Sequence, residues 1–283
     1  MKIKKLVTAA LSLTLAVSVL AGCGDSSSTT AKVIEIDLTD EEYAFGIDKT
    51  QPELLAEVNA FIKEIKENGT FDEICNHYFG DGTPVAVKSA ELDDSKDQLV
   101  VATNAAFEPF EYTPGDSYYG IDMEIAAALA EKLGKELVIQ NMDFESVCLS
   151  VGQQKCDIAM AGLTIKPDRE EYVTFTDPYY NAAQRLIVLS DDAEFDGCTD
   201  AASIETILKS KDGKVKVGVQ NGTTGQFYCQ GDESFGFDGF AMETVGYKNG
   251  SLAVQDLLNK NIDYVIIDSA PAASITASIN KMR

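Results

Sequence analysis

The chain has 283 residues and carries 46 acidic against 23 basic side chains, a formal net charge of −23 at pH 7. Such an acidic protein repels nucleic acid and anionic lipid headgroups, which excludes both as main partners and leaves a solvated acidic surface as the simplest interpretation. Its one histidine, His77, stands beside Tyr78 on a predicted terminal helix, so a Ser-His-Asp site and a histidine metal cluster are both excluded. No cofactor is expected.

Residues 1–22 have the features of a lipoprotein signal peptide. Lysines precede an apolar run over 6–20, which is too short to span a bilayer comfortably. Cys23 follows Leu-Ala-Gly and precedes the polar run GDSSSTTA, a pattern that resembles a bacterial lipobox and favours lipidation of Cys23 over an uncleaved anchor helix. We therefore expect a mature protein outside the cytoplasmic membrane, held there only by its lipid, with residues 23–32 as a tether.

A long amphipathic helix is predicted near the front of the chain. Its apolar residues recur at helical spacing: Leu54, Leu55, Val58, Phe61, Ile62 and Ile65. Thr50 is a candidate cap at the start, and Asn68-Gly69 is a candidate stop. One such helix cannot bury its stripe alone, so it must dock on a larger unit. Residues 81–97, rich in Gly, Pro, Ser and charge, predict a flexible linker behind it.

Strands and helices alternate from residue 98 onward. The first series begins with QLVVAT and the helix GIDMEIAAALAEKLG, which Gly134 ends, and continues to RLIVLS at 185–190. A second series follows, with KVKVGV, the turn QNGTTG, METVGY and IDYVIID separated by helices. Two series of this kind predict an α/β protein of two lobes, each with a mainly parallel sheet. Ligands of such sheets bind beyond the carboxyl ends of the strands.

The cysteines other than Cys23 are odd in number and fit no zinc spacing. Cys148 and Cys156 lie in apolar periodic stretches and are interpreted as small core residues. Cys198 and Cys229 lie in polar, loop-like surroundings and are the candidates for a disulfide in a thiol-poor space.

Six motifs follow one another in the order found in the family-3 extracellular solute-binding proteins, which are the polar amino acid receptors of ABC importers. They are VATNAAFEPFEY, YYGIDMEIAAALAEKLG, MDFESV, AGLTIKPDREEYVTFTDPYY, GVQNGTTG and IDYVIIDSAP. The resemblance covers nearly all of residues 98–283. It implies the two-lobed type II fold of periplasmic binding proteins.

The front of the chain resembles the end of that family's sequences. VIEIDLTDEEYA and NGTFDEICNHYFG have the form of the family's last hinge strand and terminal helices. The chain therefore resembles a circular permutation, which closely spaced surface termini make tolerable. The alternative is a truncated member with an unrelated N-terminal helix. The permutation implies these parts: hinge strand 33–37, permuted C-terminal part of lobe 1 38–80, linker 81–97, lobe 1 98–182, hinge 183–189 and lobe 2 190–283.

The motif AGLTIKPDR carries the residues that the resemblance assigns to the ligand's carboxylate. Arg169 is the candidate clamp, because a guanidinium offers two parallel donors to two oxygens. Thr164 offers a hydroxyl, and Gly162 a backbone group that a Cβ would crowd. Asp268, after the strand YVIID, is the candidate partner of the ammonium, and Asp122 is expected as a structural cap.

The remaining candidates come from the strand ends and the turn QNGTTG. Thr223 and Thr224 occupy the family's carboxylate-binding turn, which lacks the Gly-Lys-Ser/Thr of a P-loop. Phe107 and Phe144 fall where family aromatics pack on the ligand. Asn104 and Gln220 are positioned to contact its side chain.

The resemblance implies a binding protein that captures a free L-amino acid and delivers it to an ABC permease. Because Asn104 and Gln220 are neutral, we expect a neutral amino acid rather than Lys, Arg, Asp or Glu. Glu111 is the weak point of this expectation, because an inward-facing carboxylate would supply a charge. Two other functions compete: an enzyme on the same scaffold, such as a cyclohexadienyl dehydratase, and a ligand sensor that signals through a membrane receptor.

Overall fold

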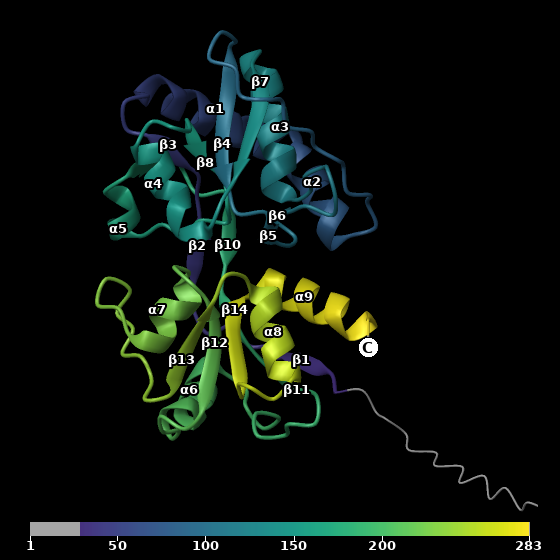
Figure 1. Cartoon of the computed structure of the whole chain (residues 1–283), viewed down its shortest axis with the longest axis vertical. Coiled ribbons are helices and arrows are strands. Elements are labelled where there is room, and N and C mark those ends of the chain that lie inside the picture. Colours follow the sequence, from purple (N-terminus) through teal and green to yellow (C-terminus); the bar gives the residue numbers. More distant parts are fainter. Residues whose placement is uncertain (1–28, 283) are drawn as a thin grey trace, which may run out of the picture.

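The computed structural model describes residues 29–282, and it shows two α/β lobes stacked along the long axis of the molecule (Figure 1). Each lobe is built on a five-stranded sheet. The predicted signal peptide and Cys23 lie outside the described residues. The fold is the two-lobed α/β architecture predicted above.

The sheet of the upper lobe has the order β7-β4-β8-β3-β9. Its strands are β7 (Glu136–Asn141), β4 (Gln98–Thr103), β8 (Ile158–Ala159), β3 (Gly46–Asp48) and β9 (Val173–Phe175). β4 runs parallel to β7 and β8, as the alternation of strands and helices predicted. β3, from the front of the chain, is inserted antiparallel between β8 and β9. The front segment is therefore an integral part of this sheet.

Helices cover both faces of the upper sheet (Figure 1). They are α1 (Pro52–Asn68), α2 (Thr70–Phe79), α3 (Ile121–Leu133), α4 (Val147–Gly152) and α5 (Pro167–Glu170), with a short 3₁₀ turn at Phe144–Ser146. The apolar stripe of α1 is buried, and Gly69 ends the helix in a left-handed conformation with φ 86°, as expected. Thr50 does not cap α1: its hydroxyl donates to Asp48 instead.

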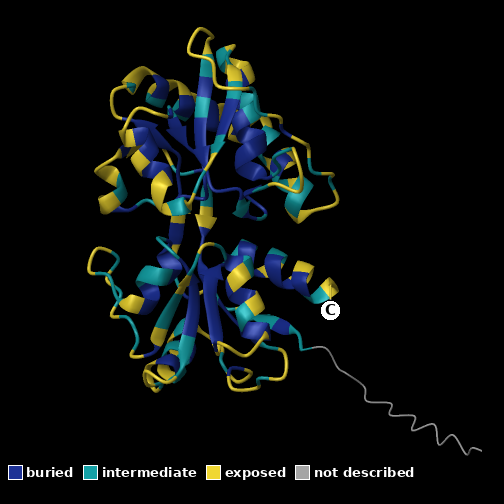
Figure 2. Cartoon of the chain, viewed as in Figure 1, coloured by how far each residue is buried: buried dark blue, intermediate teal, exposed yellow. Residues whose placement is uncertain are grey.

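The lower lobe has the sheet order β1-β11-β14-β12-β13. The strands are β1 (Ala31–Ile34), β11 (Gln184–Leu189), β14 (Tyr264–Asp268), β12 (Lys216–Gln220) and β13 (Glu243–Tyr247). Its helices are α6 (Ala201–Lys209), α7 (Thr224–Gln230), α8 (Gly250–Leu258) and α9 (Ser269–Lys281). β14 is wholly buried, and Figure 2 shows the central strands of both lobes in dark blue.

The segments that pass between the lobes differ from those predicted. Residues 33–37 and 183–189 were expected to cross, but Val33 pairs with Ile187 inside the lower sheet. The crossing ribbon is formed by β2 (Glu41–Tyr43) and β10 (Tyr180–Ala182), which pair antiparallel between the lobes (Figure 1). The apolar run of β11 is better buried in a sheet than exposed in a crossing, which explains the shift.

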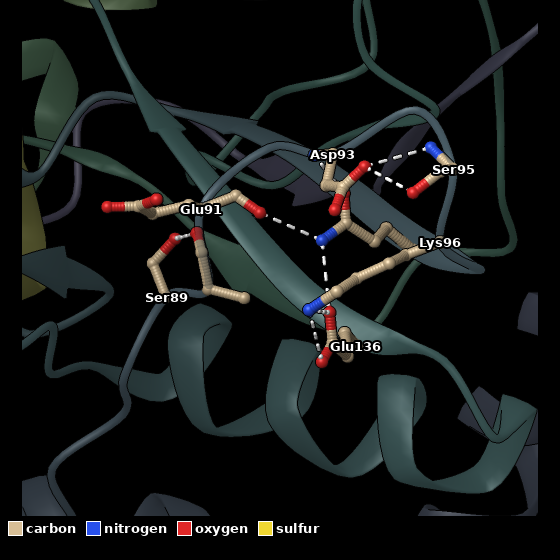
Figure 3. Close-up of polar contacts among 8 residues, drawn as sticks. Ser89, Glu91, Asp93, Ser95, Lys96 and Glu136 are labelled. Carbon is tan, nitrogen blue, oxygen red and sulfur yellow. Dashed lines mark hydrogen bonds and ion pairs between the residues drawn. The ribbon is translucent and has the colours of Figure 1, made fainter.

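Residues 81–97 are ordered, in contrast to the flexible linker predicted from their composition. Val87 is buried and pairs with Tyr118. The hydroxyl of Ser89 accepts from the backbone N–H of Ile139 at 2.8 Å, and Ala90 N–H donates to Leu137. Figure 3 shows the polar contacts that follow, around Asp93, Lys96 and Glu136. The segment therefore forms a strap along β7.

The predicted bond between Cys198 and Cys229 is not formed. Cys75, Cys148, Cys156, Cys198 and Cys229 are all free thiols. Cys229 is buried on α7 in the core of the lower lobe, and Cys198 is half-buried at the edge of the same core. Both act there as small apolar residues. Cys148 and Cys156 are buried as expected.

Candidate functional site

The carboxyl ends of three strands meet between the two lobes. β4 leads into Asn104, β12 ends at Gln220, and β14 ends at Asp268, and all three side chains are buried. The Nε2 group of Gln220 donates to Oδ1 of Asn104 across the two lobes at 3.1 Å. Asn104 in turn donates to the carbonyl of Met142 at 2.7 Å. The carboxyl ends of these strands therefore lie together between the lobes, where ligands of α/β sheets usually bind.

Arg169 reaches from α5 of the upper lobe to the lower lobe. Its guanidinium donates to the backbone carbonyl of Thr164 at 2.5 Å and to that of Gly222 at 3.0 Å. Its Cζ lies 5.2 Å from the ring centroid of Phe144. Burial lowers the pKa of Arg169, and the thiol of Cys148 and the carboxylates of Glu41 and Asp268 oppose that shift. The two predicted residues Arg169 and Phe144 are thus neighbours in the structure.

The predicted threonines join the same network. Thr224 donates its hydroxyl to that of Thr164 across the lobes at 3.2 Å, and Thr164 donates to Glu41 at 2.8 Å. Thr223 donates to the carbonyl of Gln220 at 2.8 Å, which closes the turn after β12. All three threonines are buried.

Gly162 lies against the ring of Phe107. A Cβ at Gly162 would stand 2.9 Å from that ring and 3.3 Å from the ring of Tyr43, and the residue has φ +53°. Only glycine fits this position without a shift of its neighbours. Its N–H donates to the carboxylate of Asp122 at 2.9 Å. The expectation that Asp122 caps a helix was wrong: no side chain among residues 29–282 caps the start of α3, and Asp122 holds the turn that contains Gly162.

Asp268 accepts a hydrogen bond of 2.5 Å from the hydroxyl of Tyr43. Burial raises the pKa of Asp268 to about 7, and the negative charge of Glu41 contributes, although the bond from Tyr43 lowers it. Asp268 makes no side-chain cap bond to α9, so its carboxylate is not used by that helix. The predicted ligand-binding residues thus lie in one region between the lobes.

A second group of carboxyls lies close to this region. Glu111 is fully buried, and neither of its carboxyl oxygens has a hydrogen-bond partner among the described residues. Burial raises the pKa of Glu111 well above its ordinary value, and the charges of Asp122 and Asp268 raise it further. Burial also raises the pKa of Asp122 to about 7. Glu111 is paired with Phe107 in the hairpin β5 (Ala106–Phe107) and β6 (Glu111–Tyr112).

Sequence reasoning missed Glu41, Tyr43 and Lys166. Glu41 is buried in the crossing ribbon and accepts hydrogen bonds from Thr39, Thr164 and Gln184. For Glu41 and Tyr43 the available signal was the position of LTDEEY directly after the predicted hinge strand 33–37, because only the fold brings these residues to the site. A pocket of about 180 Å³ adjoins the same place and includes Phe144, Lys166, Arg169 and, from the lower lobe, Phe227.

No helix between residues 29 and 282 has the length and apolarity needed to cross a bilayer. Across those same residues, no cluster of three or more His, Cys, Asp or Glu side chains has the arrangement of a metal site.

Comparison with known proteins gives relatives of two kinds. A putative ABC transporter arginine-binding protein of Escherichia coli is 33% identical over 170 residues, which are 60% of this chain and 62% of that protein. A cyclohexadienyl dehydratase of Pseudomonas aeruginosa is 34% identical over 99 residues, 34% of this chain and 37% of that enzyme. The chain spans less than two thirds of the length of the curated relatives it matches.

The fold has the same kind of neighbours. An ancestral arginine-binding protein, solved with bound arginine, superposes with a TM-score of 0.54 at 29% identity, over 65% of this chain and 75% of that one. Residues 99–270 match the sequence family that contains such proteins. The chain belongs to the bacterial extracellular solute-binding proteins, family 3.

Proposed function

We propose that the protein binds a free L-amino acid between its lobes and delivers it to an ABC permease. The observation that carries the proposal is the presence of a cationic and an acidic side chain at one interface: Arg169 reaches across to the lower lobe, and Asp268 lies at the end of β14. A free amino acid would offer its carboxylate to Arg169 and its ammonium to Asp268. In a low dielectric both pairs are strong.

The donors of Arg169 support its role as the carboxylate clamp. They now point at two neutral backbone carbonyls, of Thr164 and Gly222. A ligand carboxylate is a stronger, charge-assisted acceptor for the same fork of N–H groups. The hydroxyls of Thr164 and Thr224 are the further donors in this proposal, which also assigns Phe107 and Phe144 to packing on the ligand.

Glu111 favours a cationic side chain on the ligand. A buried carboxyl is costly when, as here, residues 29–282 offer it no hydrogen-bond donor, and a guanidinium or ammonium would supply both the charge and the donors. The arginine-binding relatives agree with that chemistry. A neutral polar side chain is the second candidate, because Asn104 and Gln220, bonded to each other, are both neutral.

Calorimetry on the protein without its first 28 residues separates the candidates. We expect L-arginine or L-lysine to bind, and Glu111→Gln to weaken them at least about 10-fold, which is 1.4 kcal/mol. Arg169→Ala is expected to abolish binding of every amino acid. Arg185→Ala is the control, because Arg185 pairs with Glu35 and Asp37 within the lower lobe. Binding of L-glutamine alone would support the neutral candidate, and silence of all amino acids would refute the proposal.

The dehydratase is the main alternative, since one relative carries that name and Glu111 is a buried acid with a raised pKa. Such a group is what general acid catalysis needs. We propose a binding protein because the roles proposed for the other candidate residues are all roles in holding a ligand. Incubation with a cyclohexadienyl acid is expected to leave it unchanged, and turnover would overturn this choice. A sensor function would be favoured by a neighbouring receptor gene in place of genes for a permease and an ATPase.

We further propose that Cys23 is lipidated and that the chain is circularly permuted. The family match begins at residue 99 and ends at residue 270, whereas β1 and β3 complete the two sheets from the front of the chain. That arrangement supports a permutation over an unrelated N-terminal helix. Detergent phase partitioning of the wild type and of Cys23→Ser tests the anchor: the wild type is expected in the detergent phase and the variant in water.

A further inference from the structure

Lys166 is a charged side chain buried at the junction of the lobes. It belongs to the upper lobe, where it directly precedes α5, and it is only 1% exposed. A lysine is almost never buried to this degree without partners, because an unpaired ammonium in a low dielectric is costly. Its surroundings therefore have to account for its position.

Most of these surroundings come from the lower lobe. Nζ of Lys166 lies 3.2 Å from the carboxylate of Asp232, 4.7 Å from the ring centroid of Phe227 and 5.7 Å from that of Phe235. On its own side of the junction it pairs with Asp168, which is exposed. The ammonium is thus held by one carboxylate and two aromatic faces of the opposite lobe, an arrangement in which a cation and aromatic rings attract each other.

Contacts within the lower lobe also hold the partners of Lys166. Asp232 accepts hydrogen bonds from the N–H and hydroxyl of Ser234, and its backbone pairs with Phe237. The rings of Phe227 and Phe235 stack with centroids 6.3 Å apart. A pre-formed receptor loses little entropy when the lysine enters it.

These contacts are separate from those made by the candidate ligand-binding groups. Hydrogen bonds that join the lobes elsewhere use Asn104 with Gln220, Thr164 with Thr224, and Arg169, which a ligand would engage. The Lys166 contacts use none of them. In Figure 1, α5 and α7 face each other on the same side of the molecule, so rotation of the lobes about the β2-β10 ribbon would pull Lys166 away from its partners.

We propose that Lys166 and the receptor formed by Phe227, Asp232 and Phe235 are a latch, which stabilises the closed arrangement of the lobes and slows release of a bound ligand. The effect on the lobes is independent of any ligand. The effect on release rests on the proposed function.

Small-angle scattering tests the first effect without ligand. Lys166→Met keeps the apolar stem but removes the charge, and Asp232→Asn removes the acceptor charge at a more exposed position. We expect both variants to increase the radius of gyration relative to the wild type. Lys248→Met is the matched control, because Lys248 forms an exposed pair with Asp143 at 3.6 Å and is expected to change nothing. Circular dichroism establishes that each variant is folded, and Asp232→Asn alone decides the test if Lys166→Met does not fold.

Stopped-flow release tests the second effect, with L-arginine as the probe and L-glutamine if arginine does not bind. Each single variant is expected to speed release about 10-fold, equal to 1.4 kcal/mol. The double variant is expected to be no faster than either single one, because both remove the same contact. Independent, multiplying effects, or an unchanged radius and release rate, would overturn the latch. Failure of every amino acid to bind would count against the proposed function and leave the scattering result to decide the latch.

Discussion

Ionisation of two buried aspartates, Asp122 and Asp268, is expected to affect stability and ligand binding in opposite directions. The pKa of Asp122 and that of Asp268 are each raised from 3.8 to about 7, mainly by burial. Between these values the folded protein holds protons that the unfolded chain has released. The stabilisation contributed by the two protonated carboxyls is therefore fully present below their pKa of 3.8 in the unfolded chain. It is lost as the pH rises toward their folded-state pKa of about 7. We expect the free energy of unfolding to fall from pH 5 to pH 7, by up to about 1.4 kcal/mol per pH unit for each group, and to level off above that pH.

Denaturant unfolding of the ligand-free protein across this range measures the slope. Asp122→Asn is expected to flatten it, whereas Asp200→Asn is the control, because hydrogen bonds from Ser203 lower the pKa of Asp200 and place its titration below this range. Ligand affinity is expected to rise with pH instead, since Asp268 has to ionise to hold an ammonium. Equal slopes in the wild type and Asp122→Asn would contradict the first expectation.

Single residues were predictable where a local motif carries them. Arg169, Thr164 and Gly162 all lie in AGLTIKPDR, and the structure joins Arg169 to Thr164 and Thr164 to Thr224 of the opposite lobe. The role of Lys166, in the same motif, was not predictable, because its partners lie in a loop far along the chain. Burial of Glu111 was foreseen only as the weak point of the neutral-ligand expectation, since a carboxylate next to aromatic residues normally faces water.

At the scale of elements, alternation of strands and helices predicted the two sheets, but composition wrongly predicted a flexible linker over residues 81–97. Gly, Pro and Ser indicate freedom only when nothing else holds the backbone, and here Ser89 and Ala90 hydrogen-bond to β7. The crossing ribbon was misplaced for a similar reason. Periodicity cannot show whether a short apolar strand such as β11 ends in a sheet or in a hinge.

The strap leads to a prediction about Ser89. Ser89→Ala leaves the N–H of Ile139 without its acceptor in a half-buried setting, so we expect a loss of about 1–3 kcal/mol in unfolding free energy. Ser95→Ala, at the exposed turn with Asp93, is the matched control and is expected to cost less than about 0.5 kcal/mol. A flexible linker would make the two variants equal. Urea unfolding of both measures the difference.

At the scale of the whole molecule, the position of the chain ends explains why the front segment can complete both lobes. Asn280, in the last turn of α9, donates to the carbonyl of Ala31 at 2.8 Å and accepts from its N–H at 3.1 Å. The end of the described chain therefore lies next to the first strand. A covalent connection between them would need only a few residues, while the present connection through 81–97 joins α2 to β4.

This proximity predicts that the chain can be reordered. A protein that runs from residue 98 to 283, through a short Gly-Ser linker, and then from 29 to 80 retains every strand and helix of both lobes. We expect it to fold to the same far-ultraviolet spectrum and to bind the same amino acid within about 3-fold. Loss of the strap is expected to lower its unfolding free energy by a few kcal/mol, since the bonds of Ser89 and Ala90 are removed. A chain of the same composition opened inside α3 is the control and is expected to be insoluble, because the cut divides a buried helix. Insolubility of the chain opened at residue 98 would contradict the proposed circular permutation, because that proposal requires the fold to form with either order of its elements.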